Sequence, residues 1–248
     1  MNESVEALIL SQSDYRDHDV LIRVMTQEYG ILGFIAAGAR KMTSKNAGSI
    51  LPYTKAEIQF DYKEGKTLFR LKTARTRELW RSMHEDLGRS SAAAVAAELC
   101  LGIADESGAS TREEYRYLDT AFRKINEGMN PVTVLALYMS DLMKLFGIEP
   151  DVDECVRCGE TTVHAISVKD GGFLCAKHAE EAGVHPSSVT ELRRFRLLVK
   201  GGLDQIEIIE KAGGAKPSDL EILAEMLKLH AGLELRSFAF FKRFCAIE

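Results

Sequence analysis

The sequence predicts an α+β protein in which a small β-barrel precedes an α-helical domain that carries a metal-binding insert. Three observations lead to this fold class. The first 80 residues consist of short segments with the composition and period-two alternation of β-strands. From Trp80 onwards, apolar residues recur at helical spacing. The stretch 150–186 interrupts that pattern and is polar and rich in Cys, Gly and His. We therefore expect a barrel domain at 1–80 and a helical domain at 81–248, with a metal module inserted at 150–186.

The strand segments of the N-terminal region are β-rich and bounded by polar or glycine-containing turns. They occupy 5–10, 19–25, 30–36, 56–62 and 67–74. Glu64-Gly65 has the composition of a hairpin turn, and a polar loop at 38–49 separates the third segment from the fourth. Five strands in about 75 residues favour a small closed barrel, because closure removes the exposed edges of a sheet.

The helical segments follow in two groups, one on each side of the polar insert. They occupy 90–103, 112–125, 131–146, 188–198 and 218–244. Pro131 stands where a first-turn proline is tolerated, and Gly147 is placed to end the third helix. We find no internal repeat and no low-complexity tract.

Composition and charge narrow the class of protein. Hydrophobic residues make up 46% and charged residues 28%, as in soluble proteins. No apolar run reaches the roughly 18 residues of a membrane span, and the polar N-terminus has no secretory signal, so we expect a cytoplasmic protein without a membrane partner. The net charge is −5, but residues 40–81 contain eleven basic and four acidic residues and therefore carry +7. A polyanion could dock on that stretch, since local charge decides where it binds.

The cysteine cluster has the spacing of a metal site. Cys155-x2-Cys158 is followed by Cys175-x2-His178, with sixteen residues between Cys158 and Cys175. Tetrahedral zinc takes four such ligands, and a two-residue spacer lets both ligands of a knuckle turn inward. We predict one structural Zn²⁺ per chain, held by these four residues. The alternatives are unrelated buried cysteines or a redox dithiol.

The basic stretch predicts a nucleic-acid-binding face. Arg40, Lys41 and Lys45 lie in the loop between the third and fourth strands. Lys72, Arg75 and Arg77 lie on and after the last strand. In a small barrel these cations can converge and neutralise phosphates. Tyr53, Tyr62 and Phe69 could offer stacking faces, although core positions in the barrel suit Tyr62 and Phe69 better. The alternative is an ordinary solvated basic surface.

No catalytic constellation stands out. The sequence lacks a phosphate-binding GxxxxGK[ST] loop, an HExxH helix and a GxSxG elbow. We therefore expect a binding protein and not an enzyme.

Three passages together resemble the RecO family over essentially the whole chain. The first spans 7–19 and leads into Met25-Thr26-Gln27-Glu28-Tyr29-Gly30. The second comprises 36–41, Ser44-Lys45 and Leu51-Pro52-Tyr53. The third is the Cys155-x2-Cys158-Gly159 knuckle, with Gly171-Gly172 two residues before Cys175.

The resemblance implies an OB-fold barrel, a helical domain with a zinc module and a role in recombinational repair. RecO-like proteins bind single- and double-stranded DNA and anneal complementary strands. They work with RecR and engage the acidic C-terminal tail of single-stranded DNA-binding protein so that RecA can load. Two positions depart from the family pattern: the fourth metal ligand is commonly Cys but here is His178, and the residue before Gly38 is often basic but here is Ala37.

The implied tail peptide needs an apolar pocket rimmed by cations, because its carboxylates must be paired as they lose water. The densest cationic cluster of the helical region is 192–200, where Arg193 and Arg196 lie three apart. We predict these two as partner-binding residues. The alternative is an amphipathic helix with its arginines in water. For the whole chain, the alternative functions are an RNA-binding barrel with a zinc module and a scaffold that binds only protein.

Overall fold

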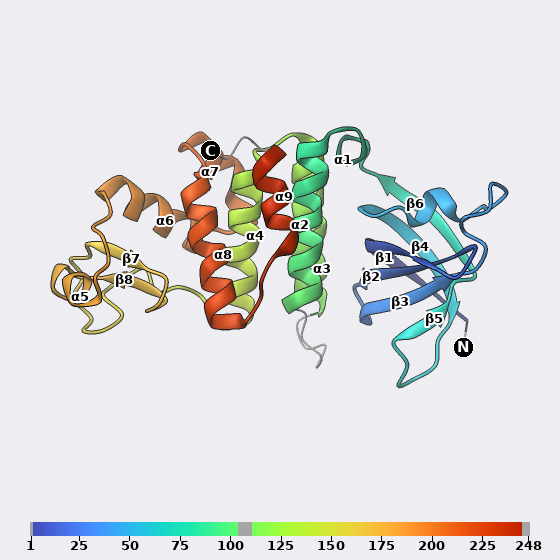
Figure 1. Ribbon diagram of the computed structural model, residues 1–248, viewed down its shortest axis with the longest axis horizontal. Helices are drawn as coiled ribbons and strands as arrows, with labels where there is room; N and C mark the ends of the chain where they lie inside the picture. The colour runs from blue at the N-terminus through green and yellow to red at the C-terminus, as the bar shows by residue number, and fades with distance from the viewer. Residues whose placement is uncertain (1, 104–110, 245–248) are drawn as a thin grey trace. The chain divides into compact units, whose positions relative to one another are not determined.

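The computed structural model describes residues 2–103 and 111–244, and Figure 1 shows their arrangement. The chain forms two compact units, Met1–Glu127 and Gly128–Glu248, which are described separately. The strands give way to helices at Trp80, as predicted, but three helices group with the barrel in the first unit. The predicted domain limits 1–80, 81–248 and 150–186 therefore stay predictions. None of the helices within the described residues has the length and apolar character needed to cross a membrane.

The N-terminal barrel is a six-stranded sheet, so the predicted β domain is confirmed. Its strands are β1 (Asn2–Tyr15), β2 (Asp19–Thr26), β3 (Gly30–Ala36), β4 (Thr54–Asp61), β5 (Leu68–Arg70) and β6 (Thr73–Leu79). Their order is β5-β3-β2-β1-β4-β6, and every pairing is antiparallel except β3 with β5. A short 3-10 turn, η1 (Ala47–Ile50), lies between β3 and β4.

The prediction of a single strand at 67–74 is wrong, because the backbone changes its hydrogen-bonding partner strand in the middle of this segment. Leu71 N donates to Ile35 O of β3, whereas the next amide, Lys72 N, donates to Gln59 O of β4, both at 3.0 Å. The segment therefore divides into β5 on one side and β6 on the other. This crossing joins the two ends of the sheet and curls it into a barrel (Figure 1).

Alternation along the strands fills the barrel with apolar side chains. Phe34, Phe60 and Phe69 are buried, with ring centroids 4.9 to 5.9 Å apart. Tyr62 is partly buried and packs on the same cluster, so Phe69 and Tyr62 lie in or against the core, as predicted. Aromatic pairs at these separations add to the stabilisation from burial.

Three helices pack with the barrel in the first unit: α1 (Arg81–Glu85), α2 (Leu87–Ile103) and α3 (Thr111–Glu127). A buried polar link joins β4 to α3. Lys55 Nζ lies 3.0 Å from Asp119 Oδ1 and 3.3 Å from Glu6 Oε1. The side chains of Lys55 and Asp119 are only 11% and 10% exposed. Tyr115 of α3 also donates to Glu6, at 2.8 Å.

The second unit is built around α4 (Pro131–Leu145), which is buried along most of its length. The Asn130 side chain accepts from Val132 N and starts this helix. The metal module follows, with β7 (Ala165–Ser167), β8 (Gly172–Leu174) and α5 (Ala176–Ala182). The remaining elements are α6 (Val189–Gly201), η2 (Leu203–Gln205), α7 (Ile206–Lys211), α8 (Pro217–Ala231) and α9 (Arg236–Phe244). Helices α6, α7 and α8 pack on α4.

One helix predicted at 218–244 is two in the structure. Gly232 adopts φ +67°, a left-handed conformation that ends α8 and that glycine tolerates best. The segment that follows turns the chain into α9, so the helical periodicity of the sequence continues across a real break.

Candidate functional site

The metal module brings together the four ligand residues that the sequence predicts. The Sγ atoms of Cys155, Cys158 and Cys175 and the Nδ1 atom of His178 all lie within 4.8 Å of one another. His178 Nδ1 is 3.3 Å from Cys155 Sγ and 3.4 Å from Cys175 Sγ, and the Sγ atoms of Cys158 and Cys175 are 3.9 Å apart. Zinc bonds of about 2.3 Å to sulfur and 2.0 Å to nitrogen give tetrahedral edges of about 3.5–3.8 Å. The cluster therefore fits a tetrahedral ion of that size.

Local structure explains how the two half-sites meet. The first pair lies in a tight turn in which Gly159 N donates to Cys155 O, at 2.8 Å, with Gly159 at φ +73°. The second pair lies at the start of α5, after the β7–β8 hairpin. Gly172 allows the hairpin to approach the first half-site, since a Cβ there would lie 2.2 Å from Asp151 O. Spacing and glycines together close the site.

The environment of Cys155 favours ligand chemistry. Burial opposes ionisation of the Cys155 thiol, but backbone N–H groups and His178 bond to its sulfur and lower its pKa to about 6. The thiolate is the form that binds a metal. Cys100 is buried in α2, as expected of a core residue. The four residues could hold a metal ion, and with all four positions supplied by protein they form a closed site of the structural kind.

The basic loop, residues 38–49, is tied to the barrel at both of its ends. At its start, Gly38 N donates to Asp19 Oδ1 at 2.8 Å, and Arg40 N donates to His18 O at 3.1 Å. At its end, Asn46 and Ser49 bind the outer edge of β6. Both ends are thus anchored to secondary structure, which holds the cations between them near one region of the barrel.

The contact with β6 has a second effect. Ala74 N donates to Asn46 Oδ1 at 3.0 Å, and Thr76 N donates to Ser49 Oγ at 3.1 Å. These side chains occupy backbone donors that an edge strand would otherwise leave unpaired. The contact also places the loop against the strand that carries Arg75 and Arg77, which is the convergence that the sequence analysis expects.

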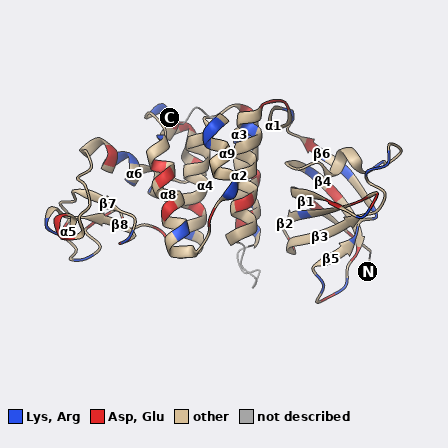
Figure 2. Cartoon of the chain, in the orientation of Figure 1, with Lys and Arg blue, Asp and Glu red and all other residues tan. Residues whose placement is uncertain are grey.

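The six predicted nucleic-acid-binding residues fall into two sets (Figure 2 shows the basic residues of the chain). Three form exposed ion pairs: Arg40 with Asp14, Lys72 with Asp61 and Arg77 with Glu57, at 3.0, 2.6 and 2.7 Å. The other three, Lys41, Lys45 and Arg75, are exposed and have no ion-pair partner within the described residues. Exposed pairs contribute little to stability, so a phosphate can replace the carboxylate at modest cost.

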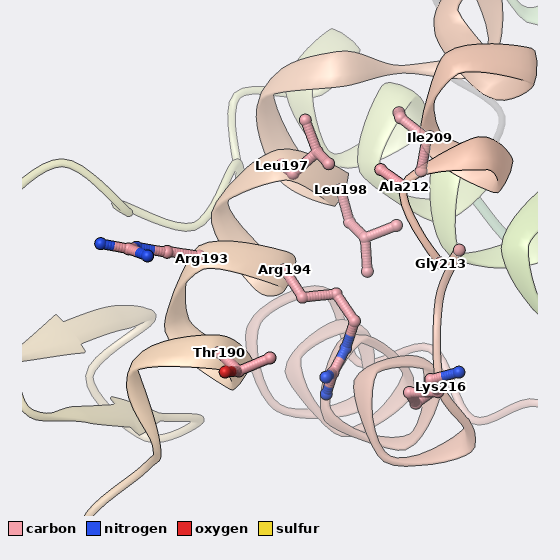
Figure 3. Close-up of a pocket in the computed structure, with 10 residues that line it drawn as sticks. Thr190, Arg193, Arg194, Leu197, Leu198, Ile209, Ala212, Gly213 and Lys216 are labelled. Atoms are coloured by element: carbon pink, nitrogen blue, oxygen red, sulfur yellow. The ribbon is translucent and has the colours of Figure 1, made fainter.

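A pocket of about 350 Å³ lies beside α6 in the second unit (Figure 3). Leu197, Leu198 and Ile209 provide its apolar lining, and Arg193, Arg194 and Lys216 provide its cations. Figure 3 shows Arg194 pointing into the pocket and Arg193 extending away from it along the outer side of α6. Arg193 and Lys216 have no ion-pair partner among residues 2–103 and 111–244.

The two predicted partner-binding residues separate in the structure. Arg193 lines this pocket, whereas Arg196 donates two hydrogen bonds to Asp153 Oδ1 in the metal module, at 3.1 and 2.7 Å. Lys200 lies 3.1 Å from the other oxygen of Asp153. Arg196 and Lys200 thus fasten the module to α6. The apolar stripe of α6, Leu192, Phe195 and Val199, is buried as in an ordinary amphipathic helix.

The sequence analysis missed the roles of Arg194 and Lys216. Arg194 makes a two-pronged ion pair with Asp219, whose side chain is 2% exposed and also accepts from Lys216 N at the start of α8. Arg194 is therefore a partly buried structural cation, held by a buried carboxylate, beside the free Arg193. Lys216 comes from the segment after α7, so helical spacing along 192–200 could not reveal it.

Comparison with known proteins adds a family match. The family model described as Recombination protein O N terminal matches residues 1–80, and that described as Recombination protein O C terminal matches residues 84–238. The DNA repair protein RecO of Limosilactobacillus fermentum is 31% identical over 215 residues, which cover 85% of this chain and 78% of that protein. The DNA repair protein RecO of Listeria monocytogenes serotype 4a is 27% identical over 244 residues, covering 97% and 94%.

Proposed function

The chain belongs to the RecO family of DNA repair proteins, and from this premise we propose that it acts as a recombination mediator in the cytoplasm. In this role it binds single- and double-stranded DNA and anneals complementary strands. With RecR it helps RecA to load on DNA coated by single-stranded DNA-binding protein. The proposal assigns the chain no catalytic step, since holding and pairing strands requires binding surfaces and no reacting group.

The anchored basic loop is the observation that carries the DNA-binding part of the proposal. Lys41, Lys45 and Arg75 are exposed cations that form no ion pair within the described part of the chain. A phosphate that binds Lys41 or Lys45 displaces only water and counterions, whereas Arg75 lies opposite Glu57 on β4 and interacts with its charge. The paired cations Arg40 and Lys72 add to this surface when phosphate replaces their carboxylates. Contacts with phosphates do not depend on the base sequence, as a protein that acts on DNA of any sequence requires.

We propose zinc as the ion of the metal module, with a structural role. Three thiolates and one imidazole are a ligand set that zinc prefers. The apolar cluster around the ligands contains five buried residues, of which Cys155 and Cys175 are themselves ligands. So small a core supplies little folding energy, and metal binding would supply the rest. The folded module in turn presents Asp153 to Arg196 of α6.

We propose the pocket beside α6 as the site for the acidic tail of single-stranded DNA-binding protein. Leu197, Leu198 and Ile209 offer an apolar lining for the side chain that ends the tail. Lys216 at the pocket, and Arg193 on the outer side of α6, are available to pair carboxylates along the tail. Arg196 could bind the tail only if its ion pair with Asp153 broke. Lys216 is therefore a better candidate than Arg196 for binding the tail together with Arg193.

The DNA-binding proposal is tested by removing two loop cations. The Arg40→Ala/Lys41→Ala variant should bind all sequences more weakly, and the slope of log K against log salt for duplex should flatten by about 1.8. The matched control is Lys177→Ala/Lys211→Ala, which removes the same charge from exposed positions of the second unit. An unchanged slope would make the loop an ordinary solvated surface.

Two further assays separate the alternative functions. Matched DNA and RNA strands compared in one titration distinguish a repair protein from an RNA-binding module, which would prefer RNA. A strand-annealing assay on DNA coated by single-stranded DNA-binding protein tests mediation directly. A pure scaffold would leave annealing unchanged and would show no salt-dependent binding to naked DNA.

A further inference from the structure

An acidic segment of the chain lies against the outer side of α6. Four of the six residues in this segment, 149–154, are acidic, and the segment leads into the metal module. Arg196 donates two hydrogen bonds to Asp153 Oδ1, and the Nζ atom of Lys200 lies 3.1 Å from Asp153 Oδ2. The same Nζ atom lies 3.6 Å from Glu149 Oε1. Helix α6 therefore already binds a short acidic peptide, which belongs to its own chain.

The cations that hold this segment continue a row that begins at the pocket beside α6. Arg193, Arg196 and Lys200 follow one another at spacings of three and four residues, so their side chains leave the helix on nearly the same side. Arg193 borders the pocket (Figure 3) and forms no ion pair within residues 2–103 and 111–244. We call the three residues the α6 ridge. The ridge is about 10 Å long, the length of about three residues of extended peptide.

A bound tail needs more than one cation. When its terminal apolar residue lies in the pocket, the acidic residues that precede it lie outside, where each carboxylate has to be paired or solvated. At the pocket, Lys216 and Arg193 are the available cations. Beyond Arg193, the ridge continues with Arg196 and Lys200. A tail with several acids that runs along the ridge therefore meets cations that the acidic segment already occupies.

The ion pairs around α6 differ in how easily they exchange. The pairs of the ridge are exposed, with side-chain exposures of 57% for Arg196, 41% for Lys200 and 51% for Asp153. Pairs at such positions contribute little stability, and a released carboxylate is solvated at once. Asp219, the partner of Arg194, is 2% exposed, so releasing it would leave a buried charge without its cation. The ridge pairs, in contrast, can yield to carboxylates from another peptide.

Other contacts besides Asp153 hold the metal module beside α6. Phe173 N of β8 donates to Asp151 O, at 2.8 Å, which holds the backbone of the acidic segment. The ring of Phe173 packs against Phe195 of α6, with centroids 6.2 Å apart. His230 of α8 bonds through Nε2 to a carbonyl oxygen of the β7–β8 turn, at 2.7 Å. Exchange therefore requires two acidic side chains to rotate into water, while the backbone of the module stays in place.

We propose that Asp153 and Glu149 are an internal competitor for the acidic tail, which occupies Arg196 and Lys200 until carboxylates of the tail replace it. This inference rests on the proposed tail site and adds its regulation. A ligand with a single carboxylate gains nothing from the occupied part of the ridge, whereas a ligand with several can displace both side chains. The competitor thus raises the selectivity of the site for a polyacidic tail, because it disfavours every ligand that cannot replace it.

Removing the competitor tests the proposal. Asp153→Asn should raise the affinity of a fluorescein-labelled tail peptide about threefold or more, because it frees Arg196 and removes one of the two carboxylates beside Lys200. Glu154→Gln is the matched control: it removes the same charge at the next position, where the side chain forms no ion pair within the described residues. Thermal melting and metal content verify that both variants fold. Unchanged affinity in Asp153→Asn, or an equal gain in Glu154→Gln, would overturn the proposal.

A double-variant cycle shows whether the gain acts through the ridge. In an Arg196→Ala/Lys200→Ala background, Asp153→Asn should leave the peptide affinity unchanged, because the cations that it would free are absent. A gain that persists in this background would indicate general charge repulsion and would refute the competition.

The peptide provides a second cycle. A version whose internal Asp and Glu residues are replaced by Asn and Gln, with its terminal residue and carboxylate kept, should bind wild type and Asp153→Asn equally. This result is expected because the altered peptide has no internal carboxylate to place on the ridge. A gain as large as that seen with the acidic peptide would count against the competitor.

The outcomes separate this inference from the function on which it rests. A tail peptide that binds neither wild type nor Asp153→Asn would refute the proposed tail site, and the competitor with it. A peptide that binds wild type, fails to bind Arg193→Glu and is unaffected by Asp153→Asn would leave the site in place and refute only the competitor.

Discussion

Replacing Lys55 by methionine should destabilise the first unit by about 3 kcal/mol, because it leaves Asp119 buried without its nearest cation. Breaking a buried pair from one side costs about 3–5 kcal/mol, since an uncompensated charge remains out of water. We expect the lower end of that range here. Arg123 also donates to Asp119, and Glu6, the second partner of Lys55, is half-exposed and can be solvated.

Trp80 provides the assay. It is the one tryptophan in the chain, it is buried, and its ring centroid lies 5.5 Å from that of Phe122 on α3. Its fluorescence therefore reports on the packing of α3 within the first unit. For a urea dependence of about 3 kcal/mol per molar, the unfolding midpoint of Lys55→Met should fall by about 1 M.

Two variants control for the loss of a methylene chain and of a charge. Lys72→Met breaks the ion pair with Asp61, in which the lysine and aspartate side chains are 44% and 66% exposed. This variant should leave the unfolding midpoint nearly unchanged. Lys55→Met/Asp119→Leu removes the buried pair from both sides and should recover most of the stability lost in the single variant. A loss below about 1 kcal/mol in Lys55→Met would refute the view that this pair is desolvated.

The pH dependence gives an independent check. Burial lowers the pKa of Lys55, but hydrogen bonds and charge from Asp119 and Glu6 outweigh it and hold the pKa above its ordinary value. A raised lysine pKa means that the folded state favours the charged form. The stabilisation is therefore complete below about pH 10 and is lost as the pH rises through the folded-state pKa. The difference between wild type and Lys55→Met should stay constant from about pH 7 to 9 and shrink above that range.

The remaining predictions concern the metal, the loop and the tail pocket. Metal analysis should find about one zinc per chain in wild type; Cys158→Ser should lose it, while Cys100→Ala should keep it. Asn46→Ala/Ser49→Ala should free one end of the basic loop and weaken DNA binding in an anisotropy titration, without loss of the barrel fold by circular dichroism. Arg193→Glu should abolish binding of the acidic tail peptide but spare naked DNA, whereas Lys211→Glu should spare both; unchanged peptide affinity would place that site elsewhere.

The sequence could predict the features that depend on local spacing. The two-residue gaps in the metal cluster fix both half-sites, and the glycines next to them mark the tight approaches, so all four ligands could be named before the geometry was known. The sequence likewise favoured core positions in the barrel for Tyr62 and Phe69, and Phe69 lies in the core with Tyr62 packed against it. In each case the interacting residues are close in sequence or repeat along one element.

Features that depend on distant partners could not be predicted in this way. The division into β5 and β6 arises because Leu71 N donates to Ile35 O and Lys72 N donates to Gln59 O. The periodicity of residues 67–74 does not indicate which strand each residue will pair with. Likewise, helical spacing put Arg193 and Arg196 together, but Asp153 of the metal module draws Arg196 away from the pocket. Side chains of one helix face different partners once the fold is formed.

The division of cations between buried and exposed partners would let an acidic protein bind DNA, as we propose for this chain. With a net charge of −5, the chain as a whole repels a polyanion. Lys55 and Arg194 have buried carboxylate partners, and exchanging these for phosphate would leave a desolvated charge behind. Arg40 and Lys72 have exposed partners, whose release to water costs little. Burial of the partner, and not the number of cations alone, therefore decides which of the paired side chains on the barrel a phosphate can recruit.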